Sequence, residues 1–76
     1  MELQGFVSDF ASQFEDVDQA LFKADTRFKE IEGWSSLTAL FIIGMVDERY
    51  NIKIKGTDIQ KSQTIEDLFE IVKSRM

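Results

Sequence analysis

Residues 36–50 read Ser-Leu-Thr-Ala-Leu-Phe-Ile-Ile-Gly-Met-Val-Asp-Glu-Arg-Tyr, and this stretch decides the fold class. From Leu37 to Val46 the side chains are apolar around most of a helical circumference. That pattern is typical of a helix that is buried on several sides or presents an apolar face to a partner. Ser35 or Ser36 is a suitable N-cap, because a serine hydroxyl accepts a hydrogen bond from a free N–H of the first turn. We therefore predict a helix over this range.

Two amphipathic stripes flank that helix. Apolar side chains recur at spacings of three and four over residues 2–15 and again over 64–75, which predicts a helix in each range. Thr64 is a suitable N-cap for the last helix. A short helix near 57–61 follows an extended Ile-Lys-Ile-Lys connection. The sequence thus predicts an all-α fold, a small three-to-four-helix bundle that forms a single domain over residues 1–76.

A long loop joins the first two main helices. Residues 16–35 show no sustained period, and a loop of this length in a compact domain usually has a function. Gly33 offers a flexible joint before the next helix. We interpret the segment as a surface crossover that four apolar side chains hold to the core: Leu21, Phe22, Phe28 and Ile31.

The composition excludes several classes of enzyme. The 76 residues contain neither Cys nor His, which removes Ser-His-Asp and Cys-His catalysis and the commonest ligands of metal sites. Serine hydroxyls and carboxylates remain, but the pattern places no acid on an apolar face where burial would raise its pKa. We therefore expect a protein that is not an enzyme and holds no metal.

Charge and hydropathy restrict the partners and the location. The net charge of −5 argues against nucleic-acid binding, which needs a basic surface. No apolar run approaches the roughly 20 residues that cross a bilayer, and the first residues lack the pattern of a signal peptide. We expect a cytoplasmic monomer that neither enters a membrane nor binds nucleic acid.

The net charge is unevenly distributed along the chain. Residues 1–36 hold eight acids against three bases, whereas residues 37–76 hold six of each. Complementary charge steers and selects partners. We therefore expect partners that recognise charge to contact the long loop more than the second helix.

Three short motifs, in this order, resemble the acyl carrier protein family. They are Gly-Trp-Ser-Ser-Leu at 33–37, Tyr-Asn-Ile-Lys-Ile at 50–54 and Thr-Ile-Glu-Asp-Leu at 64–68. No one of them is specific, but their order and spacing match, and the resemblance covers nearly the whole chain. It implies the acyl-carrier-protein fold and a non-catalytic carrier whose cofactor arm, not the protein, supplies the reactive thiol.

The resemblance implies that Ser36 carries a 4′-phosphopantetheine arm. A phosphopantetheinyl transferase would attach the arm from coenzyme A, and acyl-loading and acyl-transferring enzymes would then use it. Trp34, Ser35 and Leu37 flank the site. Ser35 replaces the Asp that usually precedes the modified serine, so Ser35 is a rival attachment point, although the register of Leu37 favours Ser36.

The resemblance also implies a partner surface on the exposed face of the second helix. That face is usually acidic, whereas here acids occur only near its end. The expected surface comprises Thr38, Phe41, Met45, Asp47 and Glu48 on the helix with Glu30 and Glu32 on the loop. Four apolar residues of the same helix either line a groove for an acyl chain or belong to the core: Leu40, Phe41, Ile43 and Val46.

Two functions remain open from the sequence. One is a carrier of fatty acyl, polyketide, amino-acyl or D-alanyl groups, in fatty acid biosynthesis or in polyketide or other secondary-metabolite biosynthesis. Trp34 and the low acidity of the second helix favour a specialised pathway over the fatty-acid one. The other is an unmodified helical module that binds a protein partner through the apolar second helix.

Overall fold

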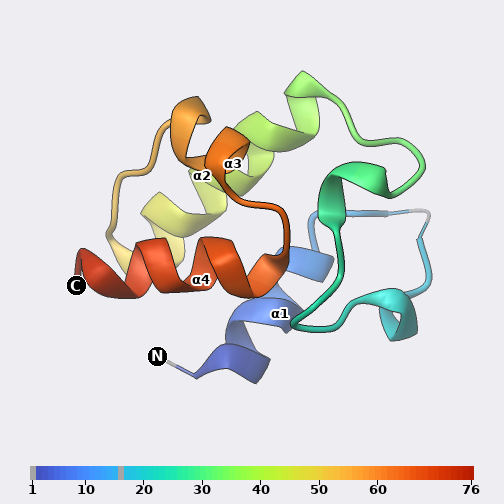
Figure 1. Cartoon of the computed structure of the whole chain (residues 1–76), viewed down its shortest axis with the longest axis horizontal. Helices are drawn as coiled ribbons and strands as arrows, with labels where there is room; N and C mark the ends of the chain where they lie inside the picture. The colour runs from blue at the N-terminus through green and yellow to red at the C-terminus, as the bar shows by residue number, and fades with distance from the viewer. Residues whose placement is uncertain (1, 16) are drawn as a thin grey trace.

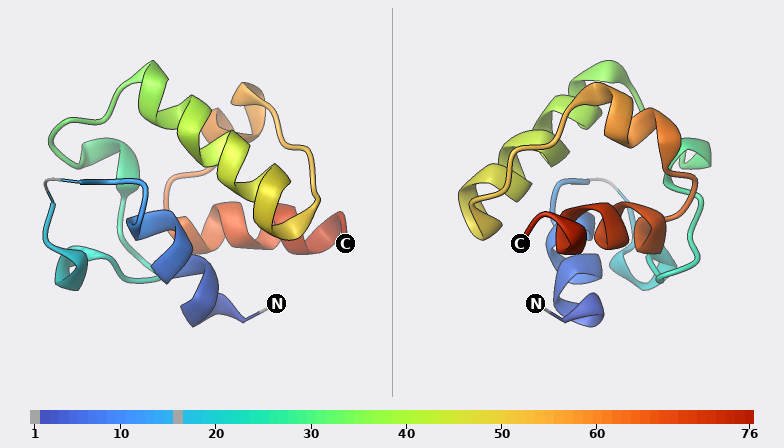
Figure 2. Two further views of the ribbon diagram at one scale, coloured as in Figure 1. Left: turned by 180° about the vertical axis from the view of Figure 1, so that it is seen from behind. Right: turned by 60° about the vertical axis from the view of Figure 1, so that its left-hand side comes forward.

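The computed structural model describes residues 2–15 and 17–76, and all regular structure in these ranges is helical. In chain order the elements are α1 (Leu3–Ala11), the 3-10 turns η1 (Gln19–Leu21) and η2 (Phe28–Glu30), α2 (Ser36–Tyr50), α3 (Gly56–Lys61) and α4 (Ile65–Ser74). Helix α1 packs against α4 and α2, and the short α3 bridges α2 and α4 (Figures 1 and 2). The prediction of an all-α bundle with a long first loop is confirmed.

The first helix is shorter than the predicted range of 2–15. It ends at Ala11, where i→i+3 bonds from Gln13 and Phe14 replace the α-helical pattern. Polar side chains take the last carbonyls: the Ser12 hydroxyl donates to the Asp9 carbonyl at 2.6 Å, and the Gln19 amide donates to that of Ala11 at 2.9 Å. Such local bonds compete with helix propagation. The apolar stripe persists beyond the helix because the tightened turn still buries Phe14.

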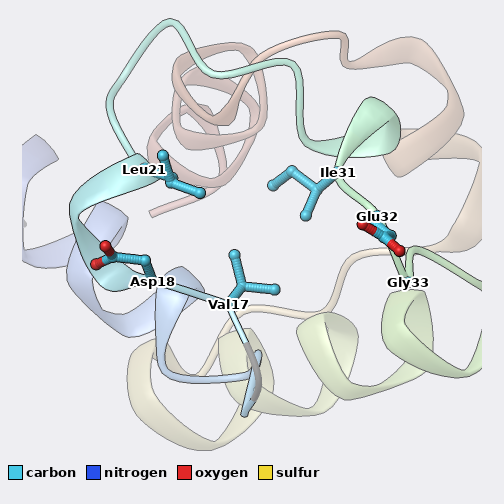
Figure 3. A pocket seen from close by; sticks show the side chains of 6 residues that line it. All are labelled: Val17, Asp18, Leu21, Ile31, Glu32 and Gly33. Atoms are coloured by element: carbon cyan, nitrogen blue, oxygen red, sulfur yellow. The ribbon is translucent and has the colours of Figure 1, made fainter.

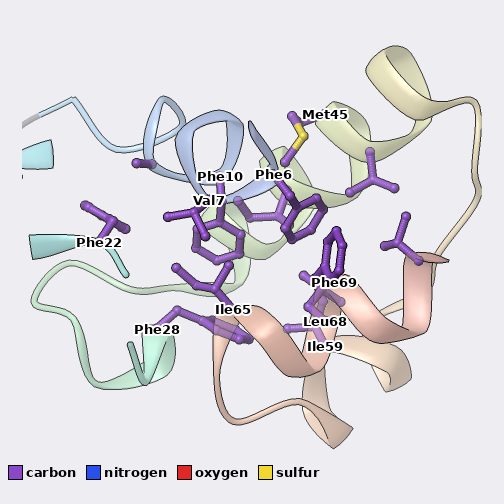
Figure 4. Packing of buried hydrophobic residues seen from close by; sticks show 14 of the residues in the cluster. Phe6, Val7, Phe10, Phe22, Phe28, Met45, Ile59, Ile65, Leu68 and Phe69 are labelled. Carbon is purple, nitrogen blue, oxygen red and sulfur yellow. The ribbon is translucent and has the colours of Figure 1, made fainter. Parts of the chain in front are cut away.

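Aromatic rings from α1, the loop and α4 form the centre of the core (Figure 4). The Phe10 and Phe28 rings lie 5.1 Å apart, and Phe6 meets Phe69 edge-on at 5.7 Å. All four side chains are buried. Aromatic pairs at these separations add about 0.5–1.5 kcal/mol each beyond the area that they bury. The loop is thus part of the core rather than a cover over it.

The long loop is held to the molecule by side chains and by backbone. Phe22 and Phe28 are buried as predicted, and Ile31 is half-buried. The prediction for Leu21 is wrong, because this side chain is 63% exposed. All three residues of η1 are exposed, because a single 3-10 turn is too short to bury a continuous stripe.

The backbone of the same loop meets the start of α4. The carbonyls of Ala24 and Thr26 accept hydrogen bonds from the N–H groups of Glu66 and Ile65, at 2.9 and 3.2 Å. Thr64 caps α4 as predicted, since its hydroxyl accepts from the Asp67 N–H at 3.1 Å. The free N–H groups at the start of α4 are therefore shared between a cap and the loop.

One acid is buried, contrary to the expectation from the sequence. Asp58 of α3 is 4% exposed, and its carboxylate receives both arms of the Arg75 guanidinium at 2.7 and 2.8 Å. It also accepts from the Lys55 N–H at 2.8 Å. The hydrogen bonds from Arg75 and then from Lys55 hold the pKa of Asp58 at about 2. Burial did not raise this pKa because paired donors favour the charged form.

The far end of α2 is tied to α1 through Asp9. The Tyr50 hydroxyl donates to this carboxylate, and Arg49 contacts it at 3.2 Å. Burial, together with the bond to Asp9, raises the pKa of Tyr50. Asn51 then ends α2 in the left-handed conformation, with φ of 57°. These contacts fix the direction of α2 and therefore the position of its N-terminus.

Candidate functional site

The N-terminus of α2 shows which of the two serines is the helix cap. Ser35 has an extended backbone, and its hydroxyl accepts a hydrogen bond from the Thr38 N–H at 3.3 Å. The same hydroxyl lies 3.3 Å from the Thr38 hydroxyl. Ser35 is therefore the N-cap of α2, and its hydroxyl is hydrogen-bonded to the first turn of that helix.

Ser36 differs from Ser35 in its position in the helix and in the hydrogen bonding of its hydroxyl. It is the first residue of α2 and is exposed to solvent. Its hydroxyl makes no hydrogen bond with any residue that the structure describes. The first turn of a helix also carries free N–H groups and the positive end of the helix dipole, which favour a negatively charged group nearby.

Aromatic contacts hold the segment before the serines. The half-buried Trp34 ring meets Phe28 edge-on at 5.1 Å and stacks near Phe14 at 6.3 Å. The backbone N–H of Trp34 donates to the Ile31 carbonyl at 3.1 Å. Gly33 has φ of +90°, a conformation that side-chain-bearing residues rarely adopt. The joint expected at Gly33 is therefore a fixed turn that delivers Trp34 to the core and the serines to the surface.

A groove of about 610 Å³ opens beside Ser36, between α2 and α3. Leu40 and Ile43 of α2 line it, together with Ile59 of α3. Lys29 lies on its rim and donates from Nζ to the Gln60 carbonyl at 3.0 Å, which links the loop to α3. We call this hollow the α2–α3 groove. It offers an apolar surface next to an exposed hydroxyl.

The four residues expected to line a groove or belong to the core divide between these roles. Val46 is fully buried and belongs to the core. Leu40 and Ile43 line the α2–α3 groove, whereas Phe41 lies outside it. Phe41 is 50% exposed and lines two smaller hollows, of about 320 and 310 Å³.

The exposed face of α2 is composed differently from the prediction. Met45 is only 4% exposed, so its assignment to the partner surface is wrong. Leu37 and Leu40, at 58% and 61% exposed, stand beside Phe41 instead. Helix α2 is apolar nearly all round, so its sequence alone does not show which side faces the core. Leu37, Leu40 and Phe41 form a patch that we call the α2 apolar face.

The structure brings some of the predicted partner residues together and separates others. Glu32 of the loop lines one hollow with Thr38 and Phe41, and Glu48 lines another with Phe41. Glu30 is exposed and lies 3.7 Å from Arg27. Asp47 is exposed but lines neither hollow. The acids therefore border the α2 apolar face rather than cover it.

Some residues at this site have no signal in the sequence. Ile59 and Gln60 reach the α2–α3 groove from α3, a segment far from Ser36 along the chain. Only the packing of α3 against α2 makes them neighbours. In the described part of the chain, no group of three or more acids gathers as a metal site, and no helix is long and apolar enough to span a membrane.

Comparison with known proteins agrees with this geometry. The chain is 36% identical over 59 residues to the acyl carrier protein of Onion yellows phytoplasma (strain OY-M). The match covers 76% of this chain and 78% of that protein. No family model matches the chain.

Proposed function

Because this chain belongs to the acyl carrier protein family, we propose that it carries an acyl group as a thioester on a 4′-phosphopantetheine arm attached to Ser36. When bound, the arm supplies the thiol that the chain lacks. The protein holds the arm at a fixed point and presents it to partner enzymes. It catalyses no reaction itself, and it acts as a cytoplasmic monomer.

The proposal rests on the Ser36 hydroxyl, because Ser36 is exposed and this hydroxyl makes no hydrogen bond with the residues that the structure describes. Attachment through a phosphodiester needs a hydroxyl that an enzyme can reach and that is not used within the fold. Ser36 meets both requirements, whereas Ser35 caps α2. The helix N-terminus at Ser36 also suits the negative charge of a phosphodiester. The free N–H groups of the first turn and Lys29 on the groove rim are the donors that would face it.

The α2–α3 groove supports the carrier function as a shelter for the acyl chain. Leu40, Ile43 and Ile59 give it apolar walls, and it begins at Ser36. Burying an acyl chain against such walls stabilises it by about 0.8 kcal/mol per methylene. The small number of acids on α2 and the presence of Trp34 support a role in a pathway of specialised biosynthesis.

Intact mass tests the attachment site directly. The protein is incubated with coenzyme A and a broad-specificity phosphopantetheinyl transferase. We expect one phosphopantetheine adduct in the wild type and in Ser35→Asp, and none in Ser36→Ala. Ser35→Asp is the matched control because Asp is an equally good N-cap and is the residue that usually precedes the modified serine. An adduct that persists in Ser36→Ala contradicts the assignment.

A second candidate function rests on the exposure of Leu40 and Phe41. These side chains are 61% and 50% exposed, and an apolar patch of this kind marks a protein interface. The chain would then bind a partner through α2 without modification. Failure of several transferases to modify the folded wild-type protein would favour this function.

A further inference from the structure

A pocket of about 550 Å³ lies within the first loop, apart from the α2–α3 groove. Val17, Leu21 and Ile31 point toward one another across it from separate stretches of the loop (Figure 3). Asp18, Glu32 and Gly33 complete its lining. We call it the loop pocket. The proposed carrier function does not use it.

The lining of the loop pocket defines the chemistry of its occupant. The floor is aliphatic, and the two charged residues that line it are both acids. One carboxylate oxygen of Asp18 already accepts from the Ala20 N–H at 2.9 Å. Glu32 is exposed and makes no salt bridge or hydrogen bond with the residues that the structure describes. An aliphatic stem that ends in a cation matches this combination, as in lysine and arginine side chains.

The position of the loop pocket shows which partner could fill it. Ser36 follows Gly33 by three positions, so at most about 11 Å of extended chain joins them. An interface of standard size covers about 800 Å² of each partner, which is a disc of about 16 Å radius. An interface of that size centred on Ser36 reaches Gly33, which lines the loop pocket. A hollow lined by Val17, Glu32, Gly33, Thr38 and Phe41 also connects the pocket with α2.

We propose that the loop pocket receives an arginine or lysine side chain of the phosphopantetheinyl transferase that modifies Ser36. This inference rests on the proposed carrier function and adds a docking point to it. The aliphatic stem packs against Val17, Leu21 and Ile31, and the cationic group pairs with Glu32. The pocket thus orients the transferase on the loop side of Ser36, where the chain has its excess of acids.

Steady-state transfer from coenzyme A by a broad-specificity transferase tests the pocket. The variants are Leu21→Ser, which removes part of the floor, and Glu32→Gln, which removes the charge. Both residues are exposed, so the fold should tolerate the changes. We expect each to raise the KM for the carrier about threefold to tenfold with kcat unchanged, because the contact is made equally in substrate and transition state. Met76→Ser and Glu70→Gln are matched controls at exposed positions at and beyond α4.

The double variant separates a single occupant from general charge attraction. If one side chain contacts both Leu21 and Glu32, the KM of Leu21→Ser/Glu32→Gln rises by less than the product of the single effects. A KM for Leu21→Ser equal to that of Met76→Ser overturns the proposal, even if Glu32→Gln has an effect. Circular dichroism checks that each variant is folded.

Other outcomes assign the pocket differently or reject the premise. A dimer of the wild type in sedimentation that Leu21→Ser dissociates would give the pocket to a second copy and overturn the proposal. A folded wild type that no transferase modifies would reject the carrier function itself, and with it the transferase as occupant. Normal modification of Ser36 with an unchanged KM in both variants rejects only the docking point.

Discussion

At the scale of single residues, Ser35 and Ser36 are neighbours with different structural roles. The Ser35 hydroxyl caps α2, and that of Ser36 is exposed. A serine hydroxyl and a carboxylate both accept from the N–H groups of the first turn, so Ser35 fills the capping role that an Asp could have at this position. What the replacement removes is one negative charge beside the proposed attachment point.

The cap makes a prediction about stability. Ser35→Ala should lower the free energy of unfolding by about 1 kcal/mol, because the N–H of Thr38 loses its acceptor. Ser35→Asp should match or exceed the wild type, since an acid also suits the helix dipole. Urea unfolding followed by circular dichroism measures both, with Ser36→Ala as the control at the adjacent exposed position. Equal stability of Ser35→Ala and wild type would contradict the capping role.

The ion pair between the buried Asp58 and the exposed Arg75 predicts the behaviour of the protein in acid. The pKa of Asp58 is about 2 in the folded protein and 3.8 as its ordinary value. Because the folded pKa is the lower one, the contribution is complete above about pH 5 and is lost as the pH falls toward 2. The stabilisation involved is on the order of 1–2 kcal/mol. Backbone hydrogen bonds from Thr64 and Gln63 also lower the pKa of Asp67, which acts in the same direction.

Unfolding midpoints between pH 7 and pH 2.5 measure this effect. The stability of Asp58→Asn should fall less steeply over that interval than the stability of the wild type. Asp25→Asn, at an exposed position of the loop, is the control and should follow the wild type. Parallel pH profiles for wild type and Asp58→Asn would show that the pair contributes nothing in solution.

At the scale of elements, the first loop depends on its aromatic anchors. Phe28 is fully buried and contacts Trp34, the single tryptophan of the chain. Phe28→Leu should leave the helices folded but loosen this contact, at a cost of about 1 kcal/mol. We expect the Trp34 emission to shift to longer wavelength and its quenching by acrylamide to increase. Phe41→Leu changes an exposed ring of α2 and should alter neither signal.

The sequence predicts the helices better than their contacts. The boundaries of α2 follow from an apolar run between a serine cap and Asn51, and the structure has the helix at the predicted range. The stripe of α1 continues through Phe14, although the helix ends at Ala11. Polar side chains there form local bonds that compete with the helix, and hydrophobic periodicity does not report them.

Two errors at the site have a common physical cause. Met45 is buried and Leu21 is exposed, the reverse of both expectations. Helix α2 and turn η1 lack a marked polar face, so only packing against other elements decides which side chains turn inward. The burial of Asp58 is not predictable for a related reason. Asp58 lies in α3, whereas its partner Arg75 lies at the C-terminal end of α4. Contacts between distant segments are not encoded in local pattern.

At the scale of the whole molecule, the excess of acids over bases belongs to the part of the chain before α2. Reversing both Glu30 and Glu32 to Lys should weaken partner binding more than reversing both Asp47 and Glu48. The reason is the charge distribution, since the net charge of −5 resides in residues 1–36. The KM of the transferase reaction at low and high salt measures the difference, which should shrink as salt increases. The opposite order would place the recognised charge on α2.

The backbone contact between the loop and α4 has a consequence for hydrogen exchange. The amides of Ile65 and Glu66 donate to carbonyls of the first loop, whereas first-turn amides normally face water and exchange fast. They are protected only while the loop is in place, so the loop and the start of α4 open as one cooperative unit. The exchange rates of these two amides therefore report whether the first loop is docked, from the opposite end of the chain.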